Sequence, residues 1–448
     1  MTTTERGIRV FVDLAEARRQ LIERTPMEAV ALPESVRARI REQWGEELSA
    51  DEVVDRILTA VRVDGDHALI DLARRIDGVA LSSLEVGRDE IERAYAALDA
   101  AVVEALRFAA ARVRAFHERQ RRNSWIDFEE GYGQLIRPLD RVGIYVPGGT
   151  AAYPSTVIMS AVPARVAGVR EVVLTSPCGR DGSLPATTLV AADIAGVDRI
   201  FRVGGAQAIG ALAFGTESVP RVDKILGPGN LFVTLAKRKV YGLVAIDALA
   251  GPTETMIIAD GHADPSLCAA DLLAQAEHDI LAQPILLTDS RVLAEQTAKE
   301  IERQLPQLDR APIARAAVAD RGGIVVTPDL ATAFALMNEY GPEHLCLHLR
   351  DPWQWLPAVK NAGGVFVGEH STEALGDYVV GPSHVMPTGG TARFNSPLTV
   401  DDFVKLISVI ALSKEKMAAL IPATATLARA EGLTAHARSV EIRAEREA

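Results

Sequence analysis

The spacing of apolar residues along the chain changes near residue 123. Before that point, apolar residues recur every three or four positions, as they do on amphipathic helices. Ser49-Ala-Asp-Glu52 has the form of a capping box and predicts a helix start. The pattern from Asp89 to Arg121 predicts one long helix. Residues 1–122 are therefore predicted to form a helical N-terminal region.

From residue 123 onward, short β-branched runs alternate with alanine-rich helical runs. This alternation predicts βαβ units, in which helices cover both faces of a parallel sheet. The first series of strands is expected at Val142–Val146, Val172–Thr175, Arg199–Val203, Lys224–Leu226 and Val244–Asp247, with helices near 156–167, 186–195, 206–214 and 231–241. The second is expected at Thr255–Ala259, Pro284–Thr288, Gly323–Thr327, Leu345–Leu349 and Gly364–Val367, with helices at 265–278, 290–304, 329–340 and 352–359.

The predicted fold is therefore α/β, with two Rossmann-like parallel-sheet units and helical N-terminal and C-terminal arms. The two α/β units are expected at 123–242 and 243–390. The segment Gly381–Pro397 is rich in Gly, Pro, Ser and Thr and predicts a long loop, and long ordered loops usually carry function. Residues 391–448 are predicted to form a helical tail from Asp401 onward, broken at Gly432 and capped again at Thr434.

Composition narrows the class of protein. A chain of 448 residues predicts two or more domains. The net charge of −12 without a long basic block argues against a nucleic-acid partner. The first residues lack an apolar signal segment, and no apolar run reaches about 18 residues, which argues against secretion and membrane insertion. Three scattered cysteines predict reduced thiols in a cytoplasmic protein: Cys178, Cys268 and Cys346.

The motif Leu-Leu-Ala-Gln-Ala-Glu-His at 272–278 is the first candidate for chemistry. Asp264 and Pro265 predict an N-cap and first residue of the helix that precedes it. Gln275 and His278 are three positions apart, so both are expected on one face of the last turn. Two metal-competent polar groups at the end of an apolar helix require partners if they are buried.

Three glycine-rich turns follow predicted strands of the first sheet: Tyr145–Gly149, Val203–Gly210 and Gly227–Asn230. Parallel α/β sheets bind ligands at the carboxyl ends of their strands, and small residues let a ligand approach the backbone there. The turns indicate a nucleotide site, although none of them has the form G-x-G-x-x-G. Tight βα turns without a ligand are the alternative.

The remaining candidates are polar residues near predicted turns. Glu343 and His344 are adjacent, and a carboxylate beside an imidazole is suited to proton transfer; a solvated loop pair is the alternative. Taken singly, the others are better explained without a ligand: Asp377 as a turn residue, His384 as a surface histidine and His436 as a helix-terminus histidine. Together with Gln275 and His278 of the helix end, two of them give a set of nitrogen and oxygen donors suited to zinc, although their spacing forms no local motif: Gln275, His278, Asp377 and His436.

At these residues the sequence resembles the histidinol dehydrogenase family, over about residues 30 to 445. The segments that carry the resemblance are RVGIYVPGG, VGGAQAIGALAFGTESVPRVDKILGPGN, GPTE, DLLAQAEHD, NEYGPEHL, ALGDYVVGPSHVMPTGGTARF and EGLTAHARSVEIR. The resemblance implies a zinc-dependent enzyme of histidine biosynthesis that performs two successive NAD-dependent oxidations. L-Histidinol becomes L-histidinaldehyde in the first and L-histidine in the second.

The resemblance also implies roles for individual residues. Zinc ligands would be Gln275, His278, Asp377 and His436, and general bases Glu343 and His344. NAD contacts would be Tyr145, Gln207 and Asn230. Substrate contacts would be Thr253 (Ser in many relatives), His384 and Glu431, besides Gln275, His278, His344, Asp377 and His436. Family members are homodimers with intertwined arms, so Glu431 and His436 would reach the active site of the other subunit.

Three alternatives stay open at this point. A paralogue on the same scaffold would oxidise another primary alcohol, such as a sulfonated diol, although Glu431 would repel a sulfonate. A zinc hydrolase would use Glu343 to activate water without a nucleotide. A noncatalytic scaffold would hold no stoichiometric zinc. The cysteines form no catalytic pair, and Cys346 is expected in the core.

Overall fold

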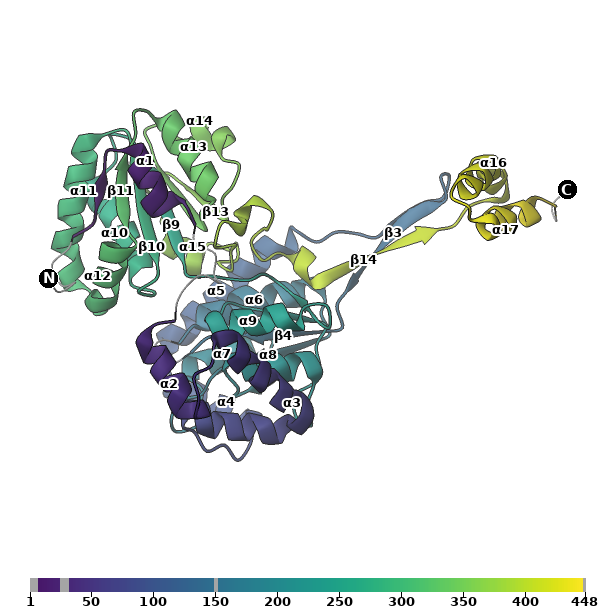
Figure 1. Ribbon diagram of the computed structural model, residues 1–448, viewed down its shortest axis with the longest axis horizontal. Helices are drawn as coiled ribbons and strands as arrows, with labels where there is room; N and C mark the ends of the chain where they lie inside the picture. The colour runs from purple at the N-terminus through teal and green to yellow at the C-terminus, as the bar shows by residue number, and fades with distance from the viewer. Residues whose placement is uncertain (1–6, 25–31, 149–151, 446–448) are drawn as a thin grey trace. The chain divides into compact units, whose positions relative to one another are not determined.

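The alternating strands and helices predicted after residue 123 are present, and they form two parallel sheets (Figure 1). The computed structural model describes residues 7–24, 32–148 and 152–445. The chain divides into two compact units: the first holds the described residues up to Gln120 together with Leu139–Phe403, and the second holds Arg121–Pro138 and the residues from Val404 onward. Among the described residues, no helix has the length and apolar character needed to cross a bilayer.

The first parallel sheet has the strand order β6-β5-β4-β7-β8. Its strands are β4 (Arg141–Tyr145), β5 (Glu171–Thr175), β6 (Arg199–Phe201), β7 (Lys224–Leu226) and β8 (Ala245–Ile246). Helices α6 (Pro154–Ala167), α7 (Ala186–Ala195), α8 (Gly205–Phe214) and α9 (Leu231–Val240) alternate with them. The direction of winding reverses between β4 and β7, which is the point where doubly wound sheets bind ligands.

The two faces of this sheet are covered by different helices because successive strand residues point to opposite sides. Val142 and Ile144 pack in a core cluster with α6, α7 and α5 (Ala100–Glu118). Val173 and Ile225 belong to a second cluster with α8, α9 and α3 (Ala50–Leu72). Burial on both faces explains the nearly continuous apolar runs of these strands.

The second parallel sheet repeats the pattern, with the order β1-β11-β10-β9-β12-β13. Its strands are β9 (Glu254–Ala259), β10 (Gln283–Thr288), β11 (Gly323–Val326), β12 (His344–His348) and β13 (Gly364–Val367), joined at the edge by β1 (Val10–Phe11). Helices α10 (Pro265–Ala276), α11 (Arg291–Gln304) and α12 (Ala311–Asp320) cover one face (Figure 1). Helices α13 (Leu330–Tyr340) and α1 (Leu14–Ala17) cover the other.

Shorter elements complete the first unit. They are α2 (Glu34–Trp44), α14 (Pro352–Trp355), α15 (Glu373–Tyr378), π-helical turns at Arg18–Ile22 and Ala73–Asp77, and 3₁₀ turns at Leu305–Gln307, Leu356–Ala358, Thr391–Arg393 and Val400–Phe403. The α/β class and the two parallel sheets are confirmed. The predicted loop at 381–397 is confirmed apart from the 3₁₀ turn that it contains. Whether the four predicted segments fold as separate domains stays a prediction.

Two predictions about the N-terminal region are corrected. The capping box of Ser49 and Glu52 is confirmed at the start of α3. The single helix predicted over Asp89–Arg121 is wrong, because α4 (Arg88–Ala97) ends at an extended Leu98 and α5 begins after it. The Asp99 side chain accepts from the Ala101 N–H at 2.8 Å and caps the new helix. The region also supplies β1, because Val10 and Phe11 pair with β11.

The prediction that the tail is helical from Asp401 onward is wrong for its first part. Val404–Ile410 is a strand, β14, which pairs antiparallel with β3 (Tyr132–Pro138); β3 pairs in turn with β2 (Trp125–Asp127). Backbone pairing with a distant segment overrides the local helical pattern here. The helices follow, as α16 (Lys414–Ala430) and α17 (Thr434–Glu445), and the predicted break at Gly432 is confirmed by its φ of +75°. Thr434 begins α17 instead of preceding it.

Candidate active site

Helix α10 places Gln275 at the edge of a polar cluster. Asp264 caps the helix by accepting from the Ser266 N–H at 2.7 Å, with Pro265 at the first position, as predicted. The helix ends at Ala276, and the His278 N–H donates to the Gln275 carbonyl at 3.1 Å. The prediction that both residues lie in the last turn is therefore wrong for His278, which follows the helix. Gln275 is buried and His278 is exposed.

Gln275 is connected to Glu343 through a single hydroxyl group. Thr253 Oγ1 lies 3.0 Å from Gln275 Oε1 and 2.6 Å from Glu343 Oε2. The Glu254 N–H donates to the same Glu343 oxygen at 3.0 Å. Two donors therefore hold this carboxylate in one orientation, with its side chain only 10% exposed.

His344 is the first residue of β12 and is buried. Its Nδ1 donates to the Glu254 carbonyl at 3.2 Å, and its Nε2 lies 3.3 Å from Asp377 Oδ1. Burial alone lowers the pKa of His344, but the charge of Glu343 and the hydrogen bonds to Asp377 and Glu343 outweigh it and raise this pKa well above its ordinary value. The alternative of a solvated loop pair is excluded, because Glu343 and His344 are both buried.

Asp377, on α15, is surrounded by imidazoles. Burial opposes its ionisation, but the hydrogen bond from His344 and the charges of His344, His384 and His278 lower its pKa. His384 Nδ1 donates to the Asp377 carbonyl at 2.8 Å, and its Nε2 lies 3.2 Å from Thr156 Oγ1. Burial lowers the pKa of His384. The long loop thus returns His384 to α15, and neither residue is a plain turn or surface residue.

This cluster occupies the amino ends of the strands of the second sheet. Thr253 precedes β9, and Glu343 and His344 stand at the start of β12. The rule that ligands bind at carboxyl ends therefore does not locate it. Partly buried carboxylates, imidazoles and an amide converge there, which is a composition suited to proton transfer and to binding a cation.

The glycine-rich turns lie at the carboxyl ends of the first sheet, as predicted. Tyr145 ends β4 and is buried, which raises its pKa to about 12, and its hydroxyl accepts from the Gly205 N–H at 3.2 Å. Gln207, also buried, lies in the first turn of α8. Asn230 caps α9 by accepting from the N–H groups of residues 232 and 233, so its amide nitrogen is the group left to donate. Gly149 lies outside the described residues.

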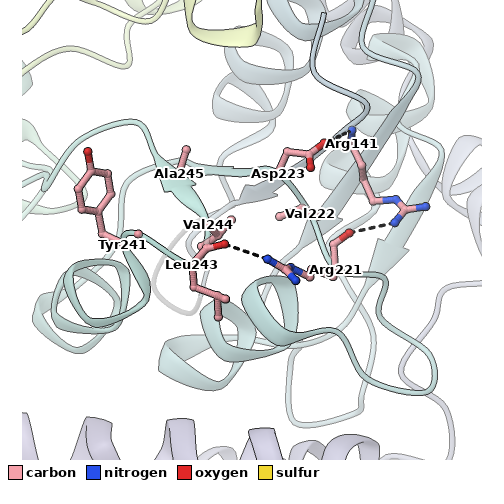
Figure 2. Close-up of a pocket in the computed structure, with 9 residues that line it drawn as sticks. Arg141, Arg221, Val222, Asp223, Tyr241, Leu243, Val244 and Ala245 are labelled. Atoms are coloured by element: carbon pink, nitrogen blue, oxygen red, sulfur yellow. Dashed lines mark hydrogen bonds between the residues drawn. The ribbon is translucent and has the colours of Figure 1, made fainter. Parts of the chain in front are cut away.

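A hollow on this unit lies apart from the predicted residues (Figure 2). It is lined by Arg141, Asp223 and their neighbours at the amino ends of β4 and β7, and by Tyr241–Ala245. Arg141 donates to the Arg221 carbonyl at 2.9 Å, and the Arg141 N–H donates to Asp223 Oδ2 at 2.9 Å (Figure 2). These internal bonds occupy its charged groups, so the hollow is explained as a structural feature.

Comparison with known proteins shows the family to which the chain belongs. The family model described as histidinol dehydrogenase matches residues 41–444. The chain belongs to the histidinol dehydrogenase family. It is 52% identical to histidinol dehydrogenase of Deinococcus radiodurans over 419 residues, which are 92% of this chain and 95% of the relative. It is 53% identical to that of Thermus thermophilus, covering 92% of this chain and 98% of the relative.

A solved structure agrees with the membership. The crystal structure of histidinol dehydrogenase from Elizabethkingia anophelis matches with a TM-score of 0.90 at 34% identity, covering 98% of this chain and 99% of that one. The family consists of oxidoreductases of histidine biosynthesis. The fold described above is therefore the histidinol dehydrogenase fold.

Within the first unit the structure brings together Gln275, Thr253, Glu343, His344, Asp377 and His384 through the contacts described above, with His278 close enough to influence the charge of Asp377. Glu431 and His436 belong to the second unit. Glu431 is the C-cap of α16, and His436 lies in the first turn of α17, where its carbonyl accepts from Ser439 Oγ at 2.8 Å.

Sequence reasoning missed three acidic residues. Glu254 is buried and forms an ion pair with Arg24. Glu373, 0% exposed, accepts from Cys346 Sγ at 3.1 Å and from the Thr255 hydroxyl. Asp77 lies 3.5 Å from Gln207 Nε2, and burial raises its pKa to about 6. Glu254 stands in the recognised GPTE segment, which was a usable signal; Asp77 stands in no such motif.

Proposed function

We propose that this chain oxidises L-histidinol to L-histidine through L-histidinaldehyde, with two molecules of NAD as hydride acceptors. The observation that carries the proposal is the contact series Gln275–Thr253–Glu343 beside His344–Asp377, in a chain of the histidinol dehydrogenase family. This series supplies one imidazole and one carboxylate for proton transfer, held next to residues that suit a divalent cation.

The residues present fit a zinc ion. Asp377 carries a carboxylate whose pKa is lowered, Gln275 offers an amide oxygen beside Thr253, and His278 offers an imidazole. The proposed fourth ligand is His436 of the partner subunit. Bound zinc would hold the nitrogen atoms of the substrate and so fix its carbinol carbon against the nicotinamide.

Protons are handled by the chain's own residues in this proposal. In the first oxidation, the carbinol carbon gives its hydride to NAD while His344, in its neutral form, accepts the hydroxyl proton, giving the aldehyde. Glu343 then takes a proton from a water molecule that adds to the aldehyde carbon. The resulting hydrate gives its hydride to a second NAD and becomes the carboxylate. Thr253, which holds Glu343, and His384, which is fixed to Asp377, would contact the substrate.

The proposed NAD contacts are Tyr145, Gln207 and Asn230. They stand at the carboxyl ends of strands or at the starts of helices, around the reversal between β4 and β7. Gly204 and Gly205 open α8, and a helix N-terminus favours a phosphate group. We therefore propose that the first sheet binds NAD and that the residues at the second sheet carry out the proton transfers.

We propose further that the chain works as a cytoplasmic homodimer. The second unit exposes large apolar side chains from its sheet and helices, including Phe128, Ile410 and Leu427. Such surface is usually covered in an assembly. In that dimer, Glu431 and His436 of the partner subunit would complete the substrate and zinc sites.

The test is anaerobic incubation of the zinc-loaded chain with L-histidinol and NAD. Two NADH per L-histidine formed is the expected stoichiometry. Turnover of a sulfonated diol in place of histidinol would favour a paralogous dehydrogenase. Ester or amide hydrolysis without NADH formation would favour a zinc hydrolase, and either result would contradict the proposal.

A further inference from the structure

The carboxyl edge of the second sheet carries a hollow that the proposed reaction does not use. The strand order reverses between β9 and β12, and open α/β sheets bind ligands outside the carboxyl ends of their strands at such a point. The hollow is lined by residues that follow these strands and β13, among them His262, His348, Glu369 and His370. The proposed active site lies at the opposite, amino ends of the same strands.

His348, the last residue of β12, connects this hollow to a buried polar cluster. Its Nε2 lies 3.2 Å from Asp271 Oδ2 on α10. Cys346 stands two positions earlier in β12, so its side chain points to the same face of the sheet. A carboxylate oxygen of Asp271, Cys346 Sγ and a ring nitrogen of His348 all lie within 4.8 Å of one another. Cys346 is 0% exposed and His348 is 1% exposed.

Among the described residues, one nitrogen of the cluster lacks a hydrogen bond, whereas Asp271 accepts from Thr372 and Cys346 donates to Glu373. Within the part of the chain that the structure describes, His348 Nε2 is buried and has no hydrogen-bond partner, because its contact with Asp271 lacks hydrogen-bond geometry. A buried polar group left in this state destabilises the fold, because it has lost its hydrogen bonds to water without replacement. The other ring nitrogen, Nδ1, lies 3.5 Å from Cys268 Sγ. His348 Nε2 therefore faces the Asp271 carboxylate without a hydrogen bond, and a cation between them would bind both groups.

We infer that Asp271, Cys346 and His348 form a binding site for a borderline-soft divalent cation such as zinc, reached from the hollow at the carboxyl ends of β9 and β12. Carboxylate, thiolate and imidazole are the ligand types that zinc takes, and three protein ligands leave the fourth position for water. On binding, the Cys346 thiol loses its proton to solvent and its sulfur bonds to the cation. The ligand charge of −2 then balances the cation.

Neighbouring groups support this assignment. Thr372 Oγ1 donates to the other Asp271 oxygen at 3.2 Å and so orients the carboxylate. The rim of the hollow carries the Glu369 carboxylate, which attracts a divalent cation, and the imidazole of His370, against one opposing charge from Arg350, which contacts His262. Without a cation, the Cys346 thiol donates to the buried Glu373 carboxylate at 3.1 Å, so cation binding has to displace this proton.

The site would join two elements of the active site. β12 begins with His344, and α10 ends with Gln275 in its last turn. A cation bound by Asp271 of α10 and by Cys346 and His348 of β12 would fix the helix against the strand. It would therefore stabilise the fold in the absence of substrate and NAD.

Cobalt(II) provides a test that separates this site from the proposed active-site zinc. The chelator-treated full chain is titrated with Co²⁺ without histidinol or NAD. The active-site ligands proposed above include no sulfur, so a thiolate-to-cobalt charge-transfer band in the near ultraviolet reports on a site outside them, and the variants below assign it to Cys346. The band is expected to saturate at one thiolate-bound cobalt per chain and to be accompanied by a rise in Tm. Its absence in the wild-type chain would overturn the site, and the result is independent of whether the chain oxidises histidinol.

Variants assign the band to its residues. Cys346→Ser is expected to abolish it, and His348→Gln and Asp271→Asn to weaken cobalt binding at this site about tenfold or more. Cys178→Ser and His278→Asn should keep the band, since neither residue belongs to the cluster. A band that persists in Cys346→Ser, or that is unchanged in both His348→Gln and Asp271→Asn, would refute the assignment. If circular dichroism shows that Cys346→Ser does not fold, the other two variants decide.

Discussion

His344 Nε2 lies 3.3 Å from Asp377 Oδ1, so the proposed base of the first oxidation touches a proposed zinc ligand directly. The Asp377 carboxylate thus contacts the His344 imidazole and is also a proposed ligand of the zinc ion. The contact fixes the imidazole ring, whose other nitrogen donates to the Glu254 carbonyl at 3.2 Å. Proton acceptance by His344 and cation binding are therefore coupled through the Asp377 side chain. Substitutions that test the two roles separately have to be made at residues other than Asp377.

Glu343 is the residue whose substitution separates the two oxidations. Glu343→Gln keeps the shape of the side chain but removes the carboxylate that takes a proton from water. We expect the oxidation of added histidinaldehyde to slow about 100-fold or more, which is typical for the loss of a general base. The oxidation of histidinol to the aldehyde should be affected less. Single-turnover NADH formation from each substrate measures the two steps.

The control is Glu339→Gln, which changes the same side chain at an exposed position paired with Arg18. It should leave both steps at the wild-type rate. Equal, small losses in both steps of Glu343→Gln would contradict the role of Glu343 in water activation.

His278 is expected to retain the metal although it lies outside the helix that carries Gln275. His278→Asn removes an imidazole donor next to Asp377, so zinc affinity in chelator competition should fall about 100-fold or more. The control His67→Asn changes an exposed histidine on α3 and should leave metal affinity unchanged. Unchanged zinc content in His278→Asn would remove this residue from the ligand set.

The parts of the fold that follow from local pattern could be predicted from the sequence. Strands buried on both faces produce continuous apolar runs, so β9 and β12 were placed within one residue. The break before α5 was missed because it depends on one capping side chain, Asp99, within an otherwise helical pattern. Strand β14 was missed because its partner β3 lies far away along the chain, and long-range pairing leaves no periodic signal in a single segment.

The candidate site likewise contains residues that the sequence indicates and residues that only the fold brings together. Glu343 and His344 were visible as an adjacent pair, but their burial comes from β9 and α15 packing around them. The metal set was assembled only through the family resemblance, since its members lie in distant segments. Asp77 gave no signal at all, because its contact with Gln207 joins positions 130 residues apart.

Asp77 should make stability depend on pH near the proposed NAD site. Burial raises its pKa from 3.8 to about 6, so the folded chain binds the proton more tightly than the unfolded chain. This contribution is fully present below pH 4 and is lost as pH rises through 6. Urea unfolding at pH 4.5 and pH 7 should show a smaller fall in stability for Asp77→Asn than for the wild type.

Asp77 is an exposed residue whose carboxyl group is nevertheless largely surrounded by protein, so solvent screening reduces the size of that difference. Asp64→Asn, an exposed change on α3, is the matched control and should preserve the wild-type pH dependence. Parallel pH profiles for the wild type and Asp77→Asn would show that Asp77 is not the group responsible.

The ion pair between Arg24 and Glu254 should hold the N-terminal segment against the active site. Arg24 contacts both oxygens of Glu254, at 2.5 and 2.8 Å, and its guanidinium lies 3.8 Å from the centre of the Tyr340 ring. The Glu254 side chain is 2% exposed, so Arg24→Met leaves a buried charge without its partner. The expected loss in the free energy of unfolding is about 3 kcal/mol. The double variant Arg24→Met, Glu254→Gln should recover part of it, because the unpaired charge is gone.

Arg18→Met breaks an exposed pair with Glu339 and should cost under about 1 kcal/mol. Equal losses for Arg24→Met and Arg18→Met in urea unfolding would show that burial does not strengthen the inner pair.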